Sequence, residues 1–214
     1  MANSNGSFGL RPLMKQGSAA NSTGTNNYTF YEIANGNTNK IYQGSPVIPL
    51  STGFIDIVGA AAGGTVGLLG VFQGCEYVSS TTGKPVFSTT WPGSGADSNH
   101  PVKAFVSDDP MQLYVIATDA TLTNEAGARA AVFANANFST ATTGTDATGV
   151  SLGRLAVSTI ATTAALHMRI MGWVDDPENA DFAAAGIGIV VRLNNHFNSN
   201  NGAIVAGTPS TTGV

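Results

Sequence analysis

The stretch LLGVFQGCEYVSSTTGKPVFSTTWP, residues 68–92, decides the fold. Two runs rich in β-branched and aromatic residues, 71–78 and 86–91, flank the small polar segment SSTTGK. This order predicts a β-hairpin with a longer loop. Gly70 and Gly74 interrupt the outgoing strand, which indicates a bulge or a close backbone approach. On the return strand, alternation places Phe87 and Trp91 on one face.

Similar alternation predicts further short strands along the chain. Residues 102–106 and 111–117 bracket an Asp-Asp-Pro turn, which favours a second hairpin-like pair. Residues 121–131 are weakly helical, and Asp176 followed by Pro177 is typical of a helix start. Other strands are expected at 28–33, 47–50, 54–58, 132–138, 166–174 and 187–193.

Short strands separated by turns, with little helix, predict an all-β fold: an antiparallel β-sandwich or barrel. We expect an extended N-terminal arm at 1–27, a β-rich body at 28–193 and a polar C-terminal tail at 194–214. A body made of two subdomains, with a boundary near 119–150, is the alternative organisation.

The surface carries few charges. Charged residues make up 10% of the chain, against roughly 25% in an average soluble domain. Such a surface resists association poorly, so we expect much of it to pack against copies or partners. A monomer with a neutral, hydroxyl-rich coat is the alternative. The net charge of −4 argues against a nucleic-acid partner, because duplex binding needs clustered lysines and arginines.

The N-terminal segment, residues 1–40, differs from the rest of the chain in charge. Residues 1–40 hold three cations and one anion, a net of +2, which leaves six cations and twelve anions, a net of −6, for residues 41–214. The cluster FGLRPLMK, residues 8–15, places apolar side chains beside basic ones, and these apolar groups need a surface to bury against. The predicted partner contacts are Phe8, Leu10, Arg11, Leu13, Met14 and Lys15.

The sequence offers no catalytic constellation and no cofactor motif. The only cysteine, Cys75, lies mid-strand and is expected to be buried and inert. The three histidines are far apart and lack metal-ligand spacing. The Asp-Asp-Pro segments at 108–110 and 175–177 are typical of turns rather than of metal sites. We therefore expect a binding protein, not an enzyme, with no catalytic, cofactor or metal site.

The longest nearly continuous apolar run, 182–191, is too short to cross a bilayer, and the first residues lack the apolar core of a signal peptide. We therefore expect no membrane association. The protein is expected to be made in a cytoplasm-like compartment and to leave it only as part of a larger particle.

Several segments together carry a family resemblance. They are FGLRPL (8–13), YEIANG (31–36), IYQGSPV (41–47), GVFQGCEYVSSTTGKPVFSTTWPG (70–93), VKAFVSDDP (102–110) and MGWVDDPENADFAAAGIGIVVRLNNH (171–196). In this order they resemble small virion proteins of tailed bacteriophages, in particular capsid decoration (cement) proteins. The resemblance covers most of the chain and consists of turn and strand features.

The resemblance implies a structural protein that binds the outer surface of a phage capsid and bridges shell subunits. Its implied partner is the major capsid protein, and its implied location is the virion surface after synthesis in the host cytoplasm. A homo-oligomer is expected, with a trimer as the guess. The alternative is a receptor- or glycan-binding module on the particle, with Trp91 or Trp173 as a stacking platform.

Overall fold

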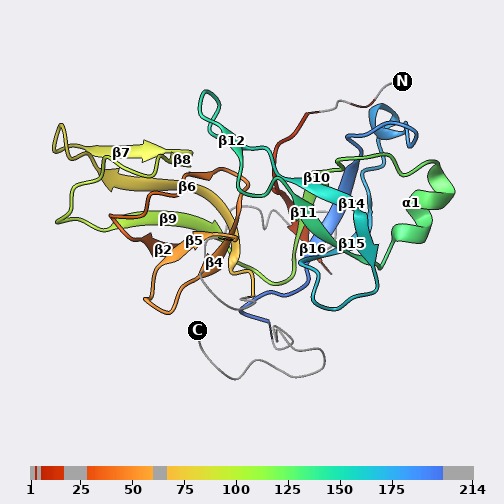
Figure 1. Cartoon of the computed structure of the whole chain (residues 1–214), viewed down its shortest axis with the longest axis horizontal. Helices are drawn as coiled ribbons and strands as arrows, with labels where there is room; N and C mark the ends of the chain where they lie inside the picture. The colour runs from red at the N-terminus through yellow and green to blue at the C-terminus, as the bar shows by residue number, and fades with distance from the viewer. Residues whose placement is uncertain (1–2, 4–5, 17–27, 60–66, 200–214) are drawn as a thin grey trace.

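The computed structural model describes residues 3, 6–16, 28–59 and 67–199. Two six-stranded sheets form most of the fold, and every pairing between named strands is antiparallel (Figure 1). The all-β antiparallel class is therefore confirmed. The single α-helix of the described residues, α1 (Glu125–Ala131), begins at Asn124, whose side chain accepts a hydrogen bond from Gly127 N. The turn after Asp176 is a short 3₁₀ segment, η2 (Pro177–Asn179), capped by that aspartate.

Sheet B is built on the hairpin predicted from the sequence. Its order is β2-β9-β6-β4-β5, and β7 pairs with the far half of β6. The strands are β2 (Thr29–Ile33), β4 (Pro46–Pro49), β5 (Ile55–Ile57), β6 (Gly70–Val78), β7 (Pro85–Ser88) and β9 (Val102–Ser107). A two-stranded ribbon of β3 (Ile41–Tyr42) and β8 (Thr90–Trp91) accompanies it.

Sheet A has the order β1-β10-β16-β15-β11-β14. Its strands are β1 (Arg11–Lys15), β10 (Gln112–Ala117), β11 (Asn135–Ser139), β14 (Arg154–Ala161), β15 (Met168–Trp173) and β16 (Gly188–Leu193). A small hairpin, β12 (Gly144–Thr145) with β13 (Val150–Ser151), lies between β11 and β14, where no strand was predicted. No local pattern in the sequence predicted a strand at β14.

The chain passes from sheet B to sheet A between β9 and β10. The expected hairpin of these two strands is wrong, because β9 pairs with β2 and β6 whereas β10 pairs with β1 and β16. Asp109 Oδ1 accepts a hydrogen bond from Met111 N (2.8 Å), as turn chemistry predicts, but the strands diverge beyond the turn. The alternative expectation placed a boundary between subdomains near 119–150. The chain crosses between the sheets earlier, at 108–111. Segment 119–150 lies among the elements of sheet A and its connections.

Two hydrophobic clusters fill the interior. The smaller lies under sheet B around Phe72, Cys75 and Trp91. The larger lies under sheet A, but it also includes Leu68 and Val71 from the sheet B side. The two sheets therefore share part of one core. The alternation predicted at 187–193 is confirmed: the residues pointing inward are Ile187, Ile189, Val191 and Leu193.

The two glycines of β6 are explained by close packing. A Cβ on Gly70 would lie 2.3 Å from Ser107 O. Gly74 has a φ of +154°, and the register with β9 shifts between Phe72 and Gly74. The predicted bulge and close approach are both present.

The ends of the described chain pack onto the fold. Within the expected arm 1–27, residues 11–15 form an edge strand of sheet A; residues 17–27 lie outside the described part. At the start of the expected tail 194–214, Asn195 and His196 are buried, and His196 forms a parallel bridge with Leu68. Residues 200–214 lie outside the described part.

Candidate contact surface

Two of the six predicted contact residues are used within this chain. Leu10 is only 1% exposed and belongs to the larger core, and its N–H donates to Gly44 O (2.9 Å). Lys15 Nζ lies 2.6 Å from Asp109 Oδ2 in an ion pair. These contacts hold the N-terminal strand against its own chain, so Leu10 and Lys15 are not free for a partner.

The other four predicted residues lie at the surface. Leu13 and Met14 are exposed, and Phe8 is half-buried. The Arg11 guanidinium lies 4.6 Å from the centre of the Phe8 ring, a cation–π contact. The segment therefore presents mixed basic and apolar groups outward, on an edge strand.

The register of sheet A extends this surface across three more strands. Arg11 is opposite Val115, which is opposite Val190. Met14 is opposite Leu113, and that row continues through Arg192 on β16 to Arg169 on β15. Residues opposite each other share a face of the sheet. We call this set the arginine face: Arg11, Met14, Leu113, Val115, Arg169, Val190 and Arg192.

The arginine face has cations without acidic partners. Strands β1, β10, β15 and β16 contain no aspartate or glutamate. Arg192 Nη1 donates to Gln16 Oε1 (2.8 Å), and Arg169 Nε donates to Asn135 Oδ1 (3.2 Å). No ion pair within the described ranges involves Arg11, Arg169 or Arg192. Burial, and then the nearby positive charge of Arg169, lowers the pKa of Arg192 below its usual value.

An open hollow adjoins this face. It has a volume of about 390 Å³, and its lining includes Met111, Arg169, Arg192 and Asn194. Met111 is 43% exposed and its sulfur lies 4.0 Å from Arg192 Nη1. A carboxylate entering here would meet guanidinium groups that bind it through two parallel hydrogen bonds, beside an apolar thioether.

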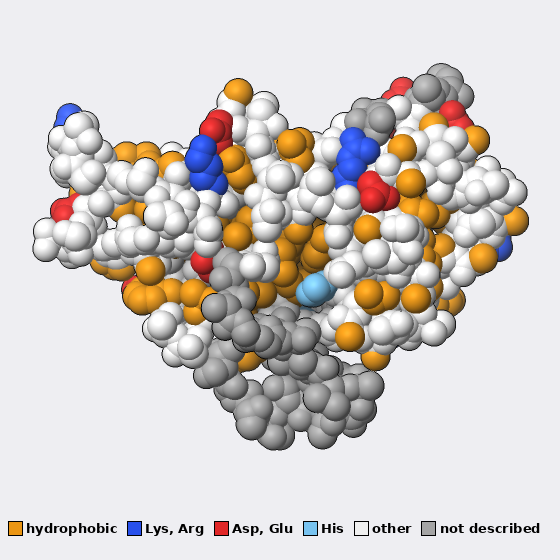
Figure 2. All heavy atoms as spheres, in the orientation of Figure 1, with side chains coloured by type: hydrophobic (Ala, Val, Ile, Leu, Met, Phe, Trp, Pro, Cys, Tyr) orange, Lys and Arg blue, Asp and Glu red, His pale blue; other side chains and the backbone are white. Residues whose placement is uncertain are grey.

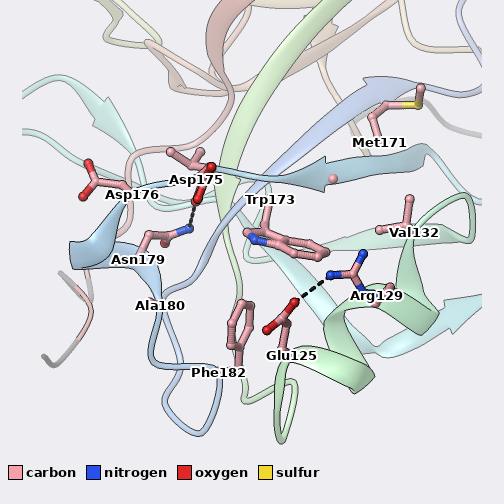
Figure 3. Close-up of a pocket in the computed structure, with 12 residues that line it drawn as sticks. Glu125, Arg129, Val132, Met171, Trp173, Asp175, Asp176, Asn179, Ala180 and Phe182 are labelled. Atoms are coloured by element: carbon pink, nitrogen blue, oxygen red, sulfur yellow. Dashed lines mark hydrogen bonds and ion pairs between the residues drawn. The ribbon is translucent and has the colours of Figure 1, made fainter.

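A larger hollow lies between α1, β15 and η2 (Figure 3), with a volume of about 590 Å³. Trp173 lies at its centre, half-buried, with the Arg129 guanidinium 5.4 Å from the ring centre and Phe182 edge-to-face at 5.7 Å. Arg129 also forms an ion pair with Glu125 (2.6 Å). We call this site the tryptophan hollow; Asp175, Asp176 and Asn179 also line it.

Trp91, the other candidate stacking platform, is fully buried. Its Nε1 donates to Asn37 O (3.2 Å), and its ring meets Tyr77 edge-to-face at 5.6 Å. The expectation that Trp91 serves as a platform is therefore wrong. The predicted common face with Phe87 is also wrong, because the strand breaks at Thr89, between β7 and β8, and Phe87 remains 72% exposed.

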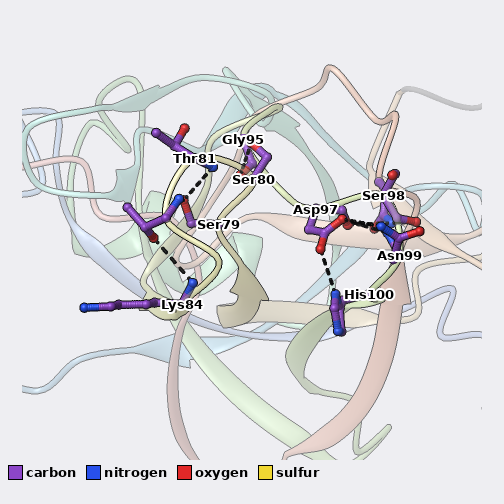
Figure 4. A network of polar contacts seen from close by, with 11 residues as sticks. Ser79, Ser80, Thr81, Lys84, Gly95, Asp97, Ser98, Asn99 and His100 are labelled. Carbon is purple, nitrogen blue, oxygen red and sulfur yellow. Dashed lines mark hydrogen bonds and ion pairs between the residues drawn. The ribbon is translucent and has the colours of Figure 1, made fainter.

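The remaining polar groups of interest are engaged in local structure. Backbone hydrogen bonds close the loop after β6: Ser79 N donates to Lys84 O, and Gly83 N donates to Ser79 O. The Ser80 hydroxyl donates to Gly95 O (Figure 4). Asp97 accepts hydrogen bonds from the backbone N–H of Asn99 and from the His100 ring. Both lower the pKa of the Asp97 carboxyl group, and the bond from Asn99 has the larger effect. These contacts fix the shape of the turn.

Cys75 is buried as predicted, and burial raises the pKa of its thiol to about 12. His167 is half-buried; its ring contacts the side chain of Asn137, and burial lowers its pKa. His196 is 1% exposed and burial lowers its pKa to about 4. In the described part of the chain, no group of three or more His, Cys, Asp and Glu side chains could hold a metal ion.

No family model, curated protein or solved structure matches this chain. Among the described residues, no helix is long and apolar enough to cross a membrane.

Of the arginine face, the sequence pattern predicted only Arg11 and Met14. Arg169 and Arg192 lie more than 150 positions after Arg11 in the chain, and only the strand order joins them. The available signal was the lack of acidic residues in RPLMK, MRIMGW and GIVVRL, three basic strands in a chain of net charge −4.

Proposed function

We propose that this chain is a structural virion protein that binds the outer surface of a phage capsid and stabilises it by bridging neighbouring shell subunits. Two independent arguments support the proposal. The first is the resemblance of its ordered turn and strand segments to capsid decoration proteins. The second, which carries most weight, is the arginine face: three guanidinium groups without carboxylate partners in the described chain, with apolar side chains between Arg11 and the Arg169–Arg192 pair.

The chemistry of this face fits an acidic protein surface. Each guanidinium offers a planar set of donors that matches a carboxylate, and Met14, Leu113, Val115 and Val190 supply apolar area between the charges. The proposed partner is therefore an acidic patch of the major capsid protein. Figure 2 shows that charged side chains are sparse on the face in view, where neutral and apolar groups predominate.

Many weak contacts suffice for this role. A shell repeats the same small interface many times, so modest affinity at each copy gives firm attachment when an oligomer engages several sites together. A homo-oligomer at the capsid surface is part of the proposal. No reaction is required of the protein.

The test is co-sedimentation of the purified chain with phage shells that lack it. A double variant, Arg169→Gln and Arg192→Gln, removes two charges from the arginine face. We expect at least about tenfold weaker binding, because an ion pair between an arginine and a shell carboxylate contributes strongly to affinity once it is buried in the interface. The matched control is Lys84→Gln with Lys40→Gln, which removes two exposed positive charges outside the arginine face. Equal binding by both variants and the wild type would overturn the assignment of this face.

As a second candidate, we propose a glycan-binding role for the tryptophan hollow. Its support is specific: an indole ring in an open cavity, with Asp175, Asp176 and Asn179 around it. Aromatic rings stack on the apolar face of a sugar while carboxylates and amides bind its hydroxyl groups. The ligand would have to displace or share the Arg129 guanidinium above the ring.

A glycan array with the full chain tests this second role. Binding to a defined sugar that is lost in Trp173→Ala, but kept in Phe133→Ala, would support it. Phe133 is a suitable control because it is 74% exposed and does not line the hollow. No binding across the array would remove the candidate.

A further inference from the structure

The outer face of sheet B is exposed and carries an ordered pattern of side chains. Strands β7, β6, β9 and β2 lie side by side in this order in the left half of Figure 1. The alternate residues Tyr31, Cys75 and Ala104 point into the smaller core. The residues between them point outward. We call the outward set the phenylalanine face: Phe30, Glu32, Glu76, Phe87, Lys103 and Phe105.

Large apolar groups on this face are left in water. Phe30 is 66% exposed and Phe87 is 72% exposed. Phe30 and Phe105 contact each other edge-to-face at 5.4 Å, which orders two rings on neighbouring strands. Exposed aromatic rings grouped on one sheet face are typical of an interaction site.

The charges of this face alternate across the strands. Glu32 is opposite Lys103, and Lys103 is opposite Glu76. The row continues to Phe87 on β7, which is opposite Glu76. No ion pair of the described chain involves any of the three charged residues, so their charges are available to a partner.

We infer that the phenylalanine face binds a second copy of this chain, face to face, about a two-fold axis that runs parallel to the strands between β6 and β9. This rotation places β9 over the partner's β6 and β6 over the partner's β9. Lys103 then faces the partner's Glu76, and Glu76 faces the partner's Lys103. The two central positions of the row are therefore complementary to each other, as a closed two-fold interface requires, and at the ends of the row Glu32 faces the partner's Phe87.

The neighbouring row fits the same symmetry. Phe105 is opposite Gly74 in the sheet, so the rotation sets Phe105 against the partner's Gly74. Gly74 has no side chain, and the Phe105 ring of the same chain lies 3.8 Å from where its Cβ would be. The rotation therefore brings the Phe105 rings of the two copies together beside the two glycines, an apolar contact of the kind found in interface cores.

This inference does not rest on the proposed capsid binding. The phenylalanine face belongs to sheet B and the arginine face to sheet A, so one can be altered while the other stays intact. If both hold, self-association would leave the arginine face of each copy free for the shell.

The test is sedimentation velocity of the full chain over a range of micromolar concentrations. The wild type is expected to dimerise. Lys103→Glu alone places two carboxylates together at each paired position, and Glu76→Lys alone places two ammonium groups together. Each variant is expected to weaken the dimer by about tenfold or more, because opposed like charges repel strongly at an interface. An equal mixture of the two variants restores both opposite-charge pairs and is expected to form the mixed dimer.

Two controls separate this result from misfolding and from general charge effects. Recovery of the mixed dimer requires both variants to be folded. Lys84→Glu and Glu178→Lys make the same charge changes at exposed positions outside the face and should leave the dimer unchanged. A monomeric wild type at all concentrations would overturn the inference. So would a dimer that survives both single reversals, or a mixture that remains monomeric.

Discussion

Arg169 on β15 and Arg192 on β16 lie directly opposite each other in sheet A, and neither guanidinium has a carboxylate partner in the described part of the chain. Like charges placed opposite one another destabilise a sheet. The fold therefore keeps an unfavourable pair of like charges on the surface that we propose binds a partner. A binding partner with acidic groups would relieve this repulsion.

Arg192→Gln should leave the fold intact or make it slightly more stable. The change removes the repulsion with Arg169, which corresponds to about 0.2–1 kcal/mol for a cross-strand pair, while glutamine keeps a donor for Gln16. Urea unfolding of the isolated chain measures the difference. A loss of more than about 1 kcal/mol would instead indicate that Arg192 supports the fold.

Leu10 and Leu13 should respond differently to truncation, although both belong to the same predicted contact segment. Leu10→Ala is expected to cost about 2–5 kcal/mol, because it opens a cavity in the larger core. Leu13 is 37% exposed, so Leu13→Ala should cost less than about 1 kcal/mol. Thermal unfolding of the two variants tests this order. Equal losses would contradict the placement of the N-terminal strand.

Gly70→Ala should be strongly destabilising. The added Cβ would meet Ser107 O at 2.3 Å, and a backbone oxygen cannot move aside cheaply. We expect a loss of about 1–3 kcal/mol or more, measured by urea unfolding. Gly36→Ala is the matched control, because nothing lies within 4 Å of its added Cβ. The close pairing of β6 with β9 is refuted if both variants are equally stable.

Stability should depend on pH through His196. Burial lowers the pKa of this imidazole from 6.5 to about 4, against smaller raising effects of Asp108 and Asp109. The unfolded chain therefore takes up the proton first as the pH falls. The stability that neutral, buried His196 contributes to the free energy of unfolding is complete above the unfolded pKa of 6.5 and is lost progressively down to about pH 4. The total is about 3 kcal/mol.

The variant His196→Gln should show a weaker pH dependence between these two values. The measurement is the free energy of unfolding of both proteins at several pH values from 4 to 7, a span set by the two pKa values. The difference between the two curves isolates the histidine from the carboxylates, which titrate in both. Parallel curves would contradict the burial of His196 in its neutral form.

Local patterns in the sequence predicted much of the fold. The structure contains four features that were predicted from neighbouring residues: the hairpin at 68–92, its glycine bulge, the alternation at 187–193 and the cap at Asp176. The prediction that β9 pairs with β10 was wrong, because a turn sequence specifies a change of chain direction and does not specify which sheet the next strand joins. On β10 the alternating inward residues are Gln112, Tyr114 and Ile116.

The candidate site was harder to predict for the same reason. Arg11 was identified from its own segment, but its neighbours on the face come from strands near residues 113, 169 and 192. No local pattern brings these positions together. The burial of Trp91 depends likewise on its pairing with Ile41 on β3, far back in the chain.

The most direct test of the central claim is an image of a phage shell decorated with this protein, at a resolution that traces strands. Our account predicts that the shell surface contacts β1, β10, β16 and β15, with acidic shell residues next to Arg11, Arg169 and Arg192. An image in which these strands face solvent while another face contacts the shell would contradict the account, as would shells that bind no protein at all.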